Sequence, residues 1–169
     1  MQSTNSQVIG WRAALAAALA RRRPADRPAR VAVLGIGNEL AGDDAAGIAV
    51  ARALIGRTQA LVIDAGPAPE NQTGPLRRFA PDLVLLVDAA QMGAPPGSVR
   101  WLDWREIEGL SASTHTLPLN LLAGYLVAEI GCDVAVIGLQ PAGNETDTPL
   151  STEARGAVEE VVRGLREAL

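Results

Sequence analysis

Three side chains from separate parts of the chain have the chemistry of a metal-contacting, hydrolytic site. Asp44 follows a glycine-rich turn, Asp88 closes an apolar run, and the single histidine, His115, stands in the segment STHT. Two carboxylates and one neutral imidazole make a mixed oxygen and nitrogen donor set that suits nickel, zinc or a similar divalent ion. Three protein ligands leave positions open for a substrate group or for a water whose pKa the metal lowers. The residue types therefore indicate metal-assisted chemistry, provided that the fold brings them together.

Each of these residues also has an ordinary structural explanation. Asp44, or its neighbour Asp43, is placed to cap a helix that begins at Ala45. Asp88 and the similarly placed Asp64 would hydrogen-bond loop amides at the ends of strands, and an isolated histidine is often structural or exposed. From spacing alone, the structural and the metal-binding interpretations both stay open.

The rest of the sequence excludes several other kinds of chemistry. All fifteen Lys and Arg residues are arginine, so the chain has no Schiff-base lysine and no Walker-type phosphate lysine. The patterns G-x-S-x-G, H-E-x-x-H and C-x-x-C are absent. The turn Gly35–Asn38 (GIGN) allows a dinucleotide-binding interpretation, but Leu40 stands where the third glycine belongs and nearby acids would repel a pyrophosphate. Cys132 opens an apolar segment and is interpreted as an inert small hydrophobe.

Alternating apolar segments must position the candidate side chains. The expected strands cover 31–37, 60–64, 82–88, 98–102 and 133–138, the fourth being a short edge strand. The expected helices cover 45–56, 75–79, 117–130 and 151–169, with one or two helical turns at 104–110. This alternation predicts an α/β fold with a mostly parallel sheet covered on both faces. Ligands bind outside the carboxyl ends of such strands, which is where Asp44, Asp64 and Asp88 fall.

The N-terminal segment is expected to precede the main fold. Residues 6–22 have helical periodicity, and Arg21–Arg30 then interrupts it with two prolines and crowded positive charge. We therefore divide the chain into a helical arm and linker, 1–29, and one domain, 30–169. The arm is interpreted as a packing or solubility element.

Composition narrows the class of protein. A chain of 169 residues that is 48% hydrophobic fits one domain with a sizeable core. A net charge of −4 argues against nucleic-acid binding, and no apolar run is long enough to insert into a membrane. The alanine-leucine stretch precedes its arginines, the reverse of a signal peptide, and one cysteine cannot form an internal disulfide. A cytoplasmic protein is expected.

Five motifs, in order along the chain, resemble the nickel-iron hydrogenase maturation endopeptidases. They are GIGNELAGDDAAG (35–47), DAGPAPEN (64–71), LVDAAQMGAPPG (86–97), STHTLPLN (113–120) and IGLQP (137–141). The resemblance spans residues 31–169 and is greatest to the branch that processes large subunits of formate-hydrogenlyase-type hydrogenases. It implies a three-layer α/β/α sandwich with a five-stranded sheet.

The resemblance also implies an activity. Members of that family have three metal-contacting residues in a cleft, which by motif are Asp44, Asp88 and His115 here, with Asp64 as a supporting acid. The expected enzyme is an endopeptidase, of the aspartic type, that removes the C-terminal extension of a nickel-loaded hydrogenase large-subunit precursor. The nickel would come with the precursor, and no organic cofactor is expected. A non-catalytic, nickel-sensing chaperone of the precursor is the alternative.

Overall fold

The fold is known from a computed structural model that describes residues 10–107 and 117–169. Its strands are β1 (Val31–Ile36), β2 (Leu61–Gly66), β3 (Leu83–Ala89), β4 (Val99–Leu102) and β5 (Asp133–Leu139). Its helices are α1 (Trp11–Arg22), α2 (Ala46–Leu54), α3 (Thr73–Phe79), α4 (Leu119–Ile130) and α5 (Thr152–Ala168), with two 3-10 helices, η1 (Gly42–Ala45) and η2 (Pro69–Gln72). Every expected strand and every expected main helix is present, with ends that differ by a few residues.

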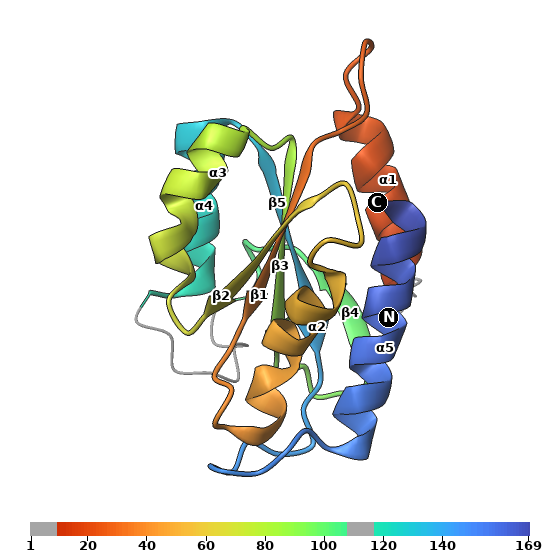
Figure 1. The fold of residues 1–169 in the computed structure, drawn as a ribbon, viewed down its shortest axis with the longest axis vertical. Helices are drawn as coiled ribbons and strands as arrows, with labels where there is room; N and C mark the ends of the chain where they lie inside the picture. Colours follow the sequence, from red (N-terminus) through yellow and green to blue (C-terminus); the bar gives the residue numbers. More distant parts are fainter. Residues whose placement is uncertain (1–9, 108–116) are drawn as a thin grey trace, which may run out of the picture.

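The strands form one sheet in the order β2-β1-β3-β5-β4 (Figure 1). All neighbouring strands are parallel except β4, which pairs antiparallel with β5 at the edge. Helices α3 and α4 lie on one face, and α1, α2 and α5 lie on the other (Figure 1). The predicted α/β sandwich with a mostly parallel five-stranded sheet is confirmed.

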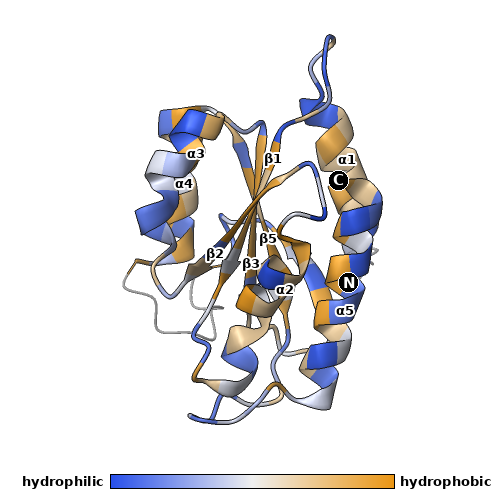
Figure 2. Cartoon of the chain, in the orientation of Figure 1, coloured by the Kyte–Doolittle hydropathy of each residue, from blue (hydrophilic) through white to orange (hydrophobic). Residues whose placement is uncertain are grey.

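The central strands are buried on both faces, which explains their continuous apolar sequence. Along β1, Val31 and Val33 face α1, α2 and α5, while Ala32 and Leu34 face α3 and α4. Figure 2 shows the apolar colour concentrated in the strands and on the inner sides of the helices. Of the helices within 10–107 and 117–169, none combines the length and the hydropathy needed to cross a membrane.

One expected element differs. At 104–110, where helical turns were expected, the described part contains a single hydrogen-bonded turn, in which the N–H of Glu106 donates to the carbonyl of Asp103. The carboxylate of Asp103 also accepts the backbone N–H of Arg105, and such local side-chain bonds compete with helix formation. Residues 108–116 lie outside the described residues.

The N-terminal helix α1 packs into the core. Trp11 and Leu15 are buried in the same cluster as β1, β3, α2 and α5. The Trp11 indole N–H donates to Glu160 at 2.7 Å, and its ring lies so close to Gly164 that a Cβ there would be 2.4 Å from it. Helix α1 therefore packs against the core, which agrees with the packing interpretation for this part of the arm, and the division of the chain at residue 29 stays a prediction.

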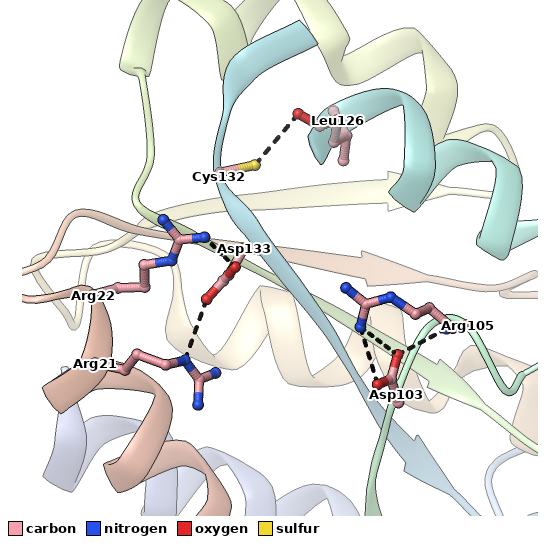
Figure 3. Close-up of polar contacts among 7 residues, drawn as sticks. All are labelled: Arg21, Arg22, Asp103, Arg105, Leu126, Cys132 and Asp133. Carbon is pink, nitrogen blue, oxygen red and sulfur yellow. Dashed lines mark hydrogen bonds and ion pairs between the residues drawn. The ribbon is translucent and has the colours of Figure 1, made fainter. Parts of the chain in front are cut away.

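The end of α1 and the arginine-rich segment after it are attached to the amino edge of the sheet by two carboxylates. Arg21 and Arg22 both pair with Asp133, the first residue of β5 (Figure 3). Arg27 makes two hydrogen bonds to Asp82, of 2.6 and 3.1 Å, just before β3 begins. These arginines hold the pKa values of Asp82 and Asp133 below the usual range for a carboxyl group. The segment is therefore bound to the domain by ion pairs that join distant parts of the sequence.

Candidate active site at the carboxyl edge of the sheet

The sheet has a topological switch point between β1 and β3. From β1 the chain continues to β2 on one side and then crosses over to place β3 on the other side. Loops that leave the carboxyl ends of β1 and β3 therefore run in opposite directions and open a crevice between them. The segment from Gly37 to Ala45 follows β1, and Asp88 lies near the end of β3. Candidate ligands therefore lie where α/β folds of this kind bind their substrates.

Asp44 lies in η1 and is only 3% exposed. Its Oδ2 accepts the backbone N–H of Asn38 at 2.9 Å, which ties η1 to the turn after β1. Gly37 permits this close approach: its φ is +143°, and a Cβ on it would lie 1.8 Å from the carbonyl oxygen of Asp44. The carboxylate is thus fixed by the glycine turn that precedes it.

The helix-capping interpretation of Asp44 and Asp43 is wrong. The N-cap residue of α2 is Ala45, and no side chain makes a capping hydrogen bond there. The reason is that η1 intervenes: its 3-10 turn places both aspartates before the first residue of α2 and directs them to other partners. Asp44 is therefore not the residue that begins the helix.

Asp43 instead joins η1 to the C-terminal part of the chain. Its carboxylate accepts the backbone N–H and the hydroxyl of Ser151, at 2.7 and 2.8 Å, and the N–H groups of Ala142 and Gly143, at 2.8 and 3.3 Å. Burial by itself would raise the pKa of Asp43, but the hydrogen bonds outweigh it and lower the pKa. Sequence reasoning did not identify this structural role, because the donors lie about a hundred residues away.

Asp88 is 1% exposed and lies opposite Gly138 of β5 in the register. Val87 faces α2 and α5, so the alternation of the strand places Asp88 on the side of α3 and α4. Gly47, three residues after Asp44, packs onto β3 so closely that a Cβ on it would be 2.1 Å from the carbonyl oxygen of Val87. Asp44 and Asp88 are therefore anchored to backbone segments that touch at the same edge of the sheet.

Strands β2 and β3 both extend further toward their carboxyl ends than the sequence predicted. β3 continues one residue past Asp88, because Ala89 pairs with Leu139. β2 continues two residues past Asp64, because Gly66 pairs with Ile36 across a register shift. Both aspartates thus belong to strands rather than ending them, and the backbone holds their Cα positions.

The third candidate, His115, lies outside the described residues. The helix that follows it, α4, enters β5 through only Gly131 and Cys132, so the end of α4 lies at the amino edge of the sheet. Its 12 residues then extend about 18 Å back toward the carboxyl edge. Within the described residues, no group of three His, Cys, Asp or Glu side chains is placed to hold a metal ion. Whether an imidazole completes the pair of carboxylates stays a prediction.

Asp64, the expected supporting acid, forms an ion pair. Its Oδ2 lies 2.6 Å from Nε of Arg52, and a terminal nitrogen of the same guanidinium lies 2.9 Å from Glu39. The two hydrogen bonds raise the pKa of Arg52, since both stabilise its charged form. Arg52 thus connects β2 to the loop after β1, and a supporting role of Asp64 in chemistry stays a prediction.

Gln140 is a buried polar residue to which sequence reasoning assigned no role. Its Oε1 accepts the N–H groups of Met92 and Ala94 at 2.7 and 3.3 Å, and its Nε2 donates to the side chain of Gln91 at 2.9 Å. It therefore holds the loop that follows Asp88. The signal in the sequence was an amide directly after a fully apolar strand, in the motif IGLQP.

Three backbone amides of the glycine turn, of the kind that a pyrophosphate site uses, already have acceptors within the protein. The N–H of Gly37 donates to the carbonyl of Gly66, the N–H of Asn38 to Asp44, and the N–H of Leu40 to the side chain of Asn38. A dinucleotide phosphate binds at this kind of turn through such groups. The contacts therefore disfavour the dinucleotide interpretation.

The cysteine belongs to the packing of the domain. Cys132 is buried, and its Sγ lies 3.7 Å from the carbonyl of Leu126 (Figure 3). Burial raises the pKa of its thiol to about 11, so the reactive thiolate is scarce at neutral pH. This agrees with the interpretation of Cys132 as an inert hydrophobe.

Comparisons with known proteins agree with one another. A family model described as HycI, hydrogenase maturation protease, matches residues 48–167. The Hydrogenase 3 maturation protease of Escherichia coli K12 is 38% identical over 136 residues, which cover 79% of this chain and 86% of the relative. A putative hydrogenase maturation protease of Methanocaldococcus jannaschii is 33% identical over 150 residues, which cover 83% and 88%. The crystal structure of the maturation protease HycI from Thermococcus kodakarensis superposes with a TM-score of 0.77 at 33% identity, covering 83% of this chain and 92% of that one.

Proposed function

The chain belongs to the hydrogenase maturation protease family, and we propose that it is the endopeptidase that removes the C-terminal extension of a nickel-loaded nickel-iron hydrogenase large-subunit precursor. The observation that carries the proposal is the placement of two buried carboxylates, Asp44 and Asp88, on touching backbone segments at the carboxyl edge of the sheet. The relatives are named as proteases, which supports a hydrolase. The cytoplasm is the proposed location.

In this proposal the nickel is part of the substrate. Asp44, Asp88 and His115 contact the metal that the precursor already holds, and in this way they fix the adjacent scissile bond in the crevice. Carboxylate oxygens and an imidazole nitrogen are suitable donors for such an ion. Positioning a peptide bond against its attacking water lowers the barrier by several kcal/mol, up to about 11 in well-oriented reactions. Recognition of the metal thus also restricts cleavage to precursors that are already loaded.

The same groups carry the proposed proton transfer. A water attacks the scissile carbonyl carbon, and a carboxylate, for which Asp44 is the candidate, accepts its proton. The same group then returns this proton to the leaving amine nitrogen as the C–N bond breaks. His115 must be neutral to bind a metal, so cleavage should decline as the pH falls below roughly 6. A pH–rate profile of precursor cleavage measures this decline.

The decisive experiment incubates the protein with nickel-loaded and nickel-free precursor and follows the mass of the precursor. We expect loss of the C-terminal peptide from the loaded form only. Formation of a stable complex without any loss of mass would instead favour the chaperone.

Variants then test the three candidate residues. Asp88→Asn keeps the volume and removes the charge, and we expect it, like His115→Ala, to lower kcat/KM by at least about a hundredfold with an unchanged melting temperature. Asp103→Asn, which removes an exposed carboxylate of a surface ion pair, serves as the control and should cleave at the wild-type rate. Normal cleavage by Asp88→Asn would reject the site.

A further inference from the structure

Leu40 is a large apolar residue whose side chain is exposed to solvent in the loop that precedes Asp44. It is 60% exposed, and it lies two residues after Asn38, whose N–H donates to the carboxylate of Asp44. An exposed leucine alone needs no explanation, since folded proteins present many apolar atoms to solvent. The geometry of this loop distinguishes Leu40 from such a residue.

The loop that carries Leu40 is fixed on both sides. The N–H of Leu40 donates to the side-chain oxygen of Asn38 at 3.0 Å, and its carbonyl accepts the N–H of Asp147 at 2.7 Å. The N–H of Ala41 donates to the carbonyl of Asn38 at 3.1 Å. Gly42, with φ +52°, then lets the loop pack so closely that a Cβ would be 2.7 Å from Oγ1 of Thr148. Because this backbone is already held in place, a partner that covers Leu40 restricts only the side-chain rotamer and does not have to order the loop.

The other exposed large apolar residues of the described chain have different surroundings. The hydroxyl oxygen of Tyr125 accepts a hydrogen bond from Arg77, whose guanidinium also lies over the Tyr125 ring. Ile55, 51% exposed, is the C-cap of α2, which starts at the carboxyl edge and runs to the amino edge of the sheet. Leu121 lies in the first turn of α4. Leu40 alone among the four lies on the turn that binds Asp44.

We propose that Leu40 is a specificity-determining contact for the polypeptide substrate, and that its side chain packs against an apolar side chain of the precursor next to the scissile segment. The proposal rests on the proposed function, because it takes the crevice as the place where the polypeptide binds. Removing a leucine-sized apolar surface from water strengthens binding in the ground state and in the transition state alike. The contact therefore acts on KM.

The test compares Leu40→Ser, Leu40→Met and Ile55→Ser in steady-state cleavage of the nickel-loaded precursor from the same organism. Leu40→Ser should raise KM about tenfold with kcat within about twofold of wild type, the signature of lost uniform binding. Leu40→Met, of similar volume and polarity, should return KM to within about threefold of wild type. Ile55→Ser, which removes an equally exposed apolar side chain at the opposite edge, should leave both constants unchanged. All three should melt at the wild-type temperature, because both positions are exposed.

Three outcomes would overturn the proposal: a wild-type KM for Leu40→Ser, an equal rise in KM for Ile55→Ser, or a loss confined to kcat. If the wild-type protein binds the precursor without cleaving it, the proposed function fails, and the same three variants are compared by their Kd for the precursor. A Kd about tenfold weaker in Leu40→Ser only then supports the contact, and equal Kd values reject it. A wild-type protein that neither cleaves nor binds the precursor rejects both.

Discussion

Two adjacent aspartates of the chain, Asp43 and Asp44, have different uses. Asp43 is surrounded by four hydrogen-bond donors from the segment that leads into α5. Asp44 instead accepts the backbone N–H of Asn38 in the turn after β1. Spacing alone indicates that either residue could cap a helix, and only the family resemblance selects Asp44 as the metal-contacting residue. Which one is structural depends on donors from Ala142 onward.

Asp43→Ala should lower the free energy of unfolding by about 3 kcal/mol, because it leaves buried N–H and hydroxyl groups without an acceptor. Urea denaturation measures the change. Asp103→Ala, at an exposed carboxylate, should change stability by less than about 0.5 kcal/mol. Equal midpoints for the two variants would show that Asp43 does not hold η1 in place.

At the scale of elements, the position of Asp44 depends on how closely α2 approaches the sheet. Gly47 lies in the first turn of α2, and a Cβ on it would be 2.1 Å from the carbonyl of Val87 and 2.4 Å from that of Ile36. Glycine within a helix usually lowers its stability relative to alanine. Here the absence of a side chain lets the helix, and η1 just before it, lie against β1 and β3.

Two glycine-to-alanine changes in helices should therefore have opposite signs. Gly47→Ala should lower the free energy of unfolding by about 2 kcal/mol or more and reduce precursor cleavage, because the helix must move away from β3. Gly156→Ala, in α5 with nothing within 4 Å of the new Cβ, should raise stability by about 0.5–1 kcal/mol and leave cleavage unchanged. Thermal unfolding measures the stability of both variants. A Gly47→Ala variant more stable than wild type would contradict the close contact between α2 and β3.

At the scale of the molecule, α1 and the linker after it pack against the sheet and its helices. Trp11 and Leu15 of α1 complete the core on one face of the sheet. Asp82 then receives hydrogen bonds from the side chain of Arg27 and from the backbone N–H of Arg30. The ion pair is partly exposed, so its contribution to stability is reduced by solvent screening.

The attachment at Asp82 should make stability depend on pH. The hydrogen bond from Arg27 lowers the pKa of Asp82 in the folded protein. A carboxyl group whose pKa is lower in the folded state contributes stability above its unfolded pKa, near 4, and loses it as the pH falls through the folded value. The stability difference between wild type and Asp82→Asn should therefore be constant from about pH 5 to 7 and shrink below about pH 4. Arg27→Ala should reproduce this behaviour, and a difference that stays constant down to pH 2.5 would contradict it.

The predicted elements agree closely with the fold because their signals are local. β1, β3 and β5 are apolar without interruption, as strands buried on both faces must be, and α5 repeats its apolar residues at helical spacing. The positions of Asp44 and Asp88 at the carboxyl edge followed from the order of these elements. The fold class and the edge of the sheet at which the candidate site lies could therefore be predicted from local sequence patterns.

Only the tertiary structure decided which side chains meet. The hydrogen bond between Asp43 and Ser151 joins residues 108 positions apart, and the one between Arg27 and Asp82 joins residues 55 positions apart. No sequence pattern around one partner identifies the other. The pairing of Ala89 with Leu139, which carries β3 past Asp88, likewise depends on the choice of neighbouring strand. The spacing of apolar residues within a segment indicates which face of that segment is buried. Contacts between residues far apart in the sequence depend on how several segments pack together. For that reason the residues that hold the candidate site in place became visible only in the folded chain.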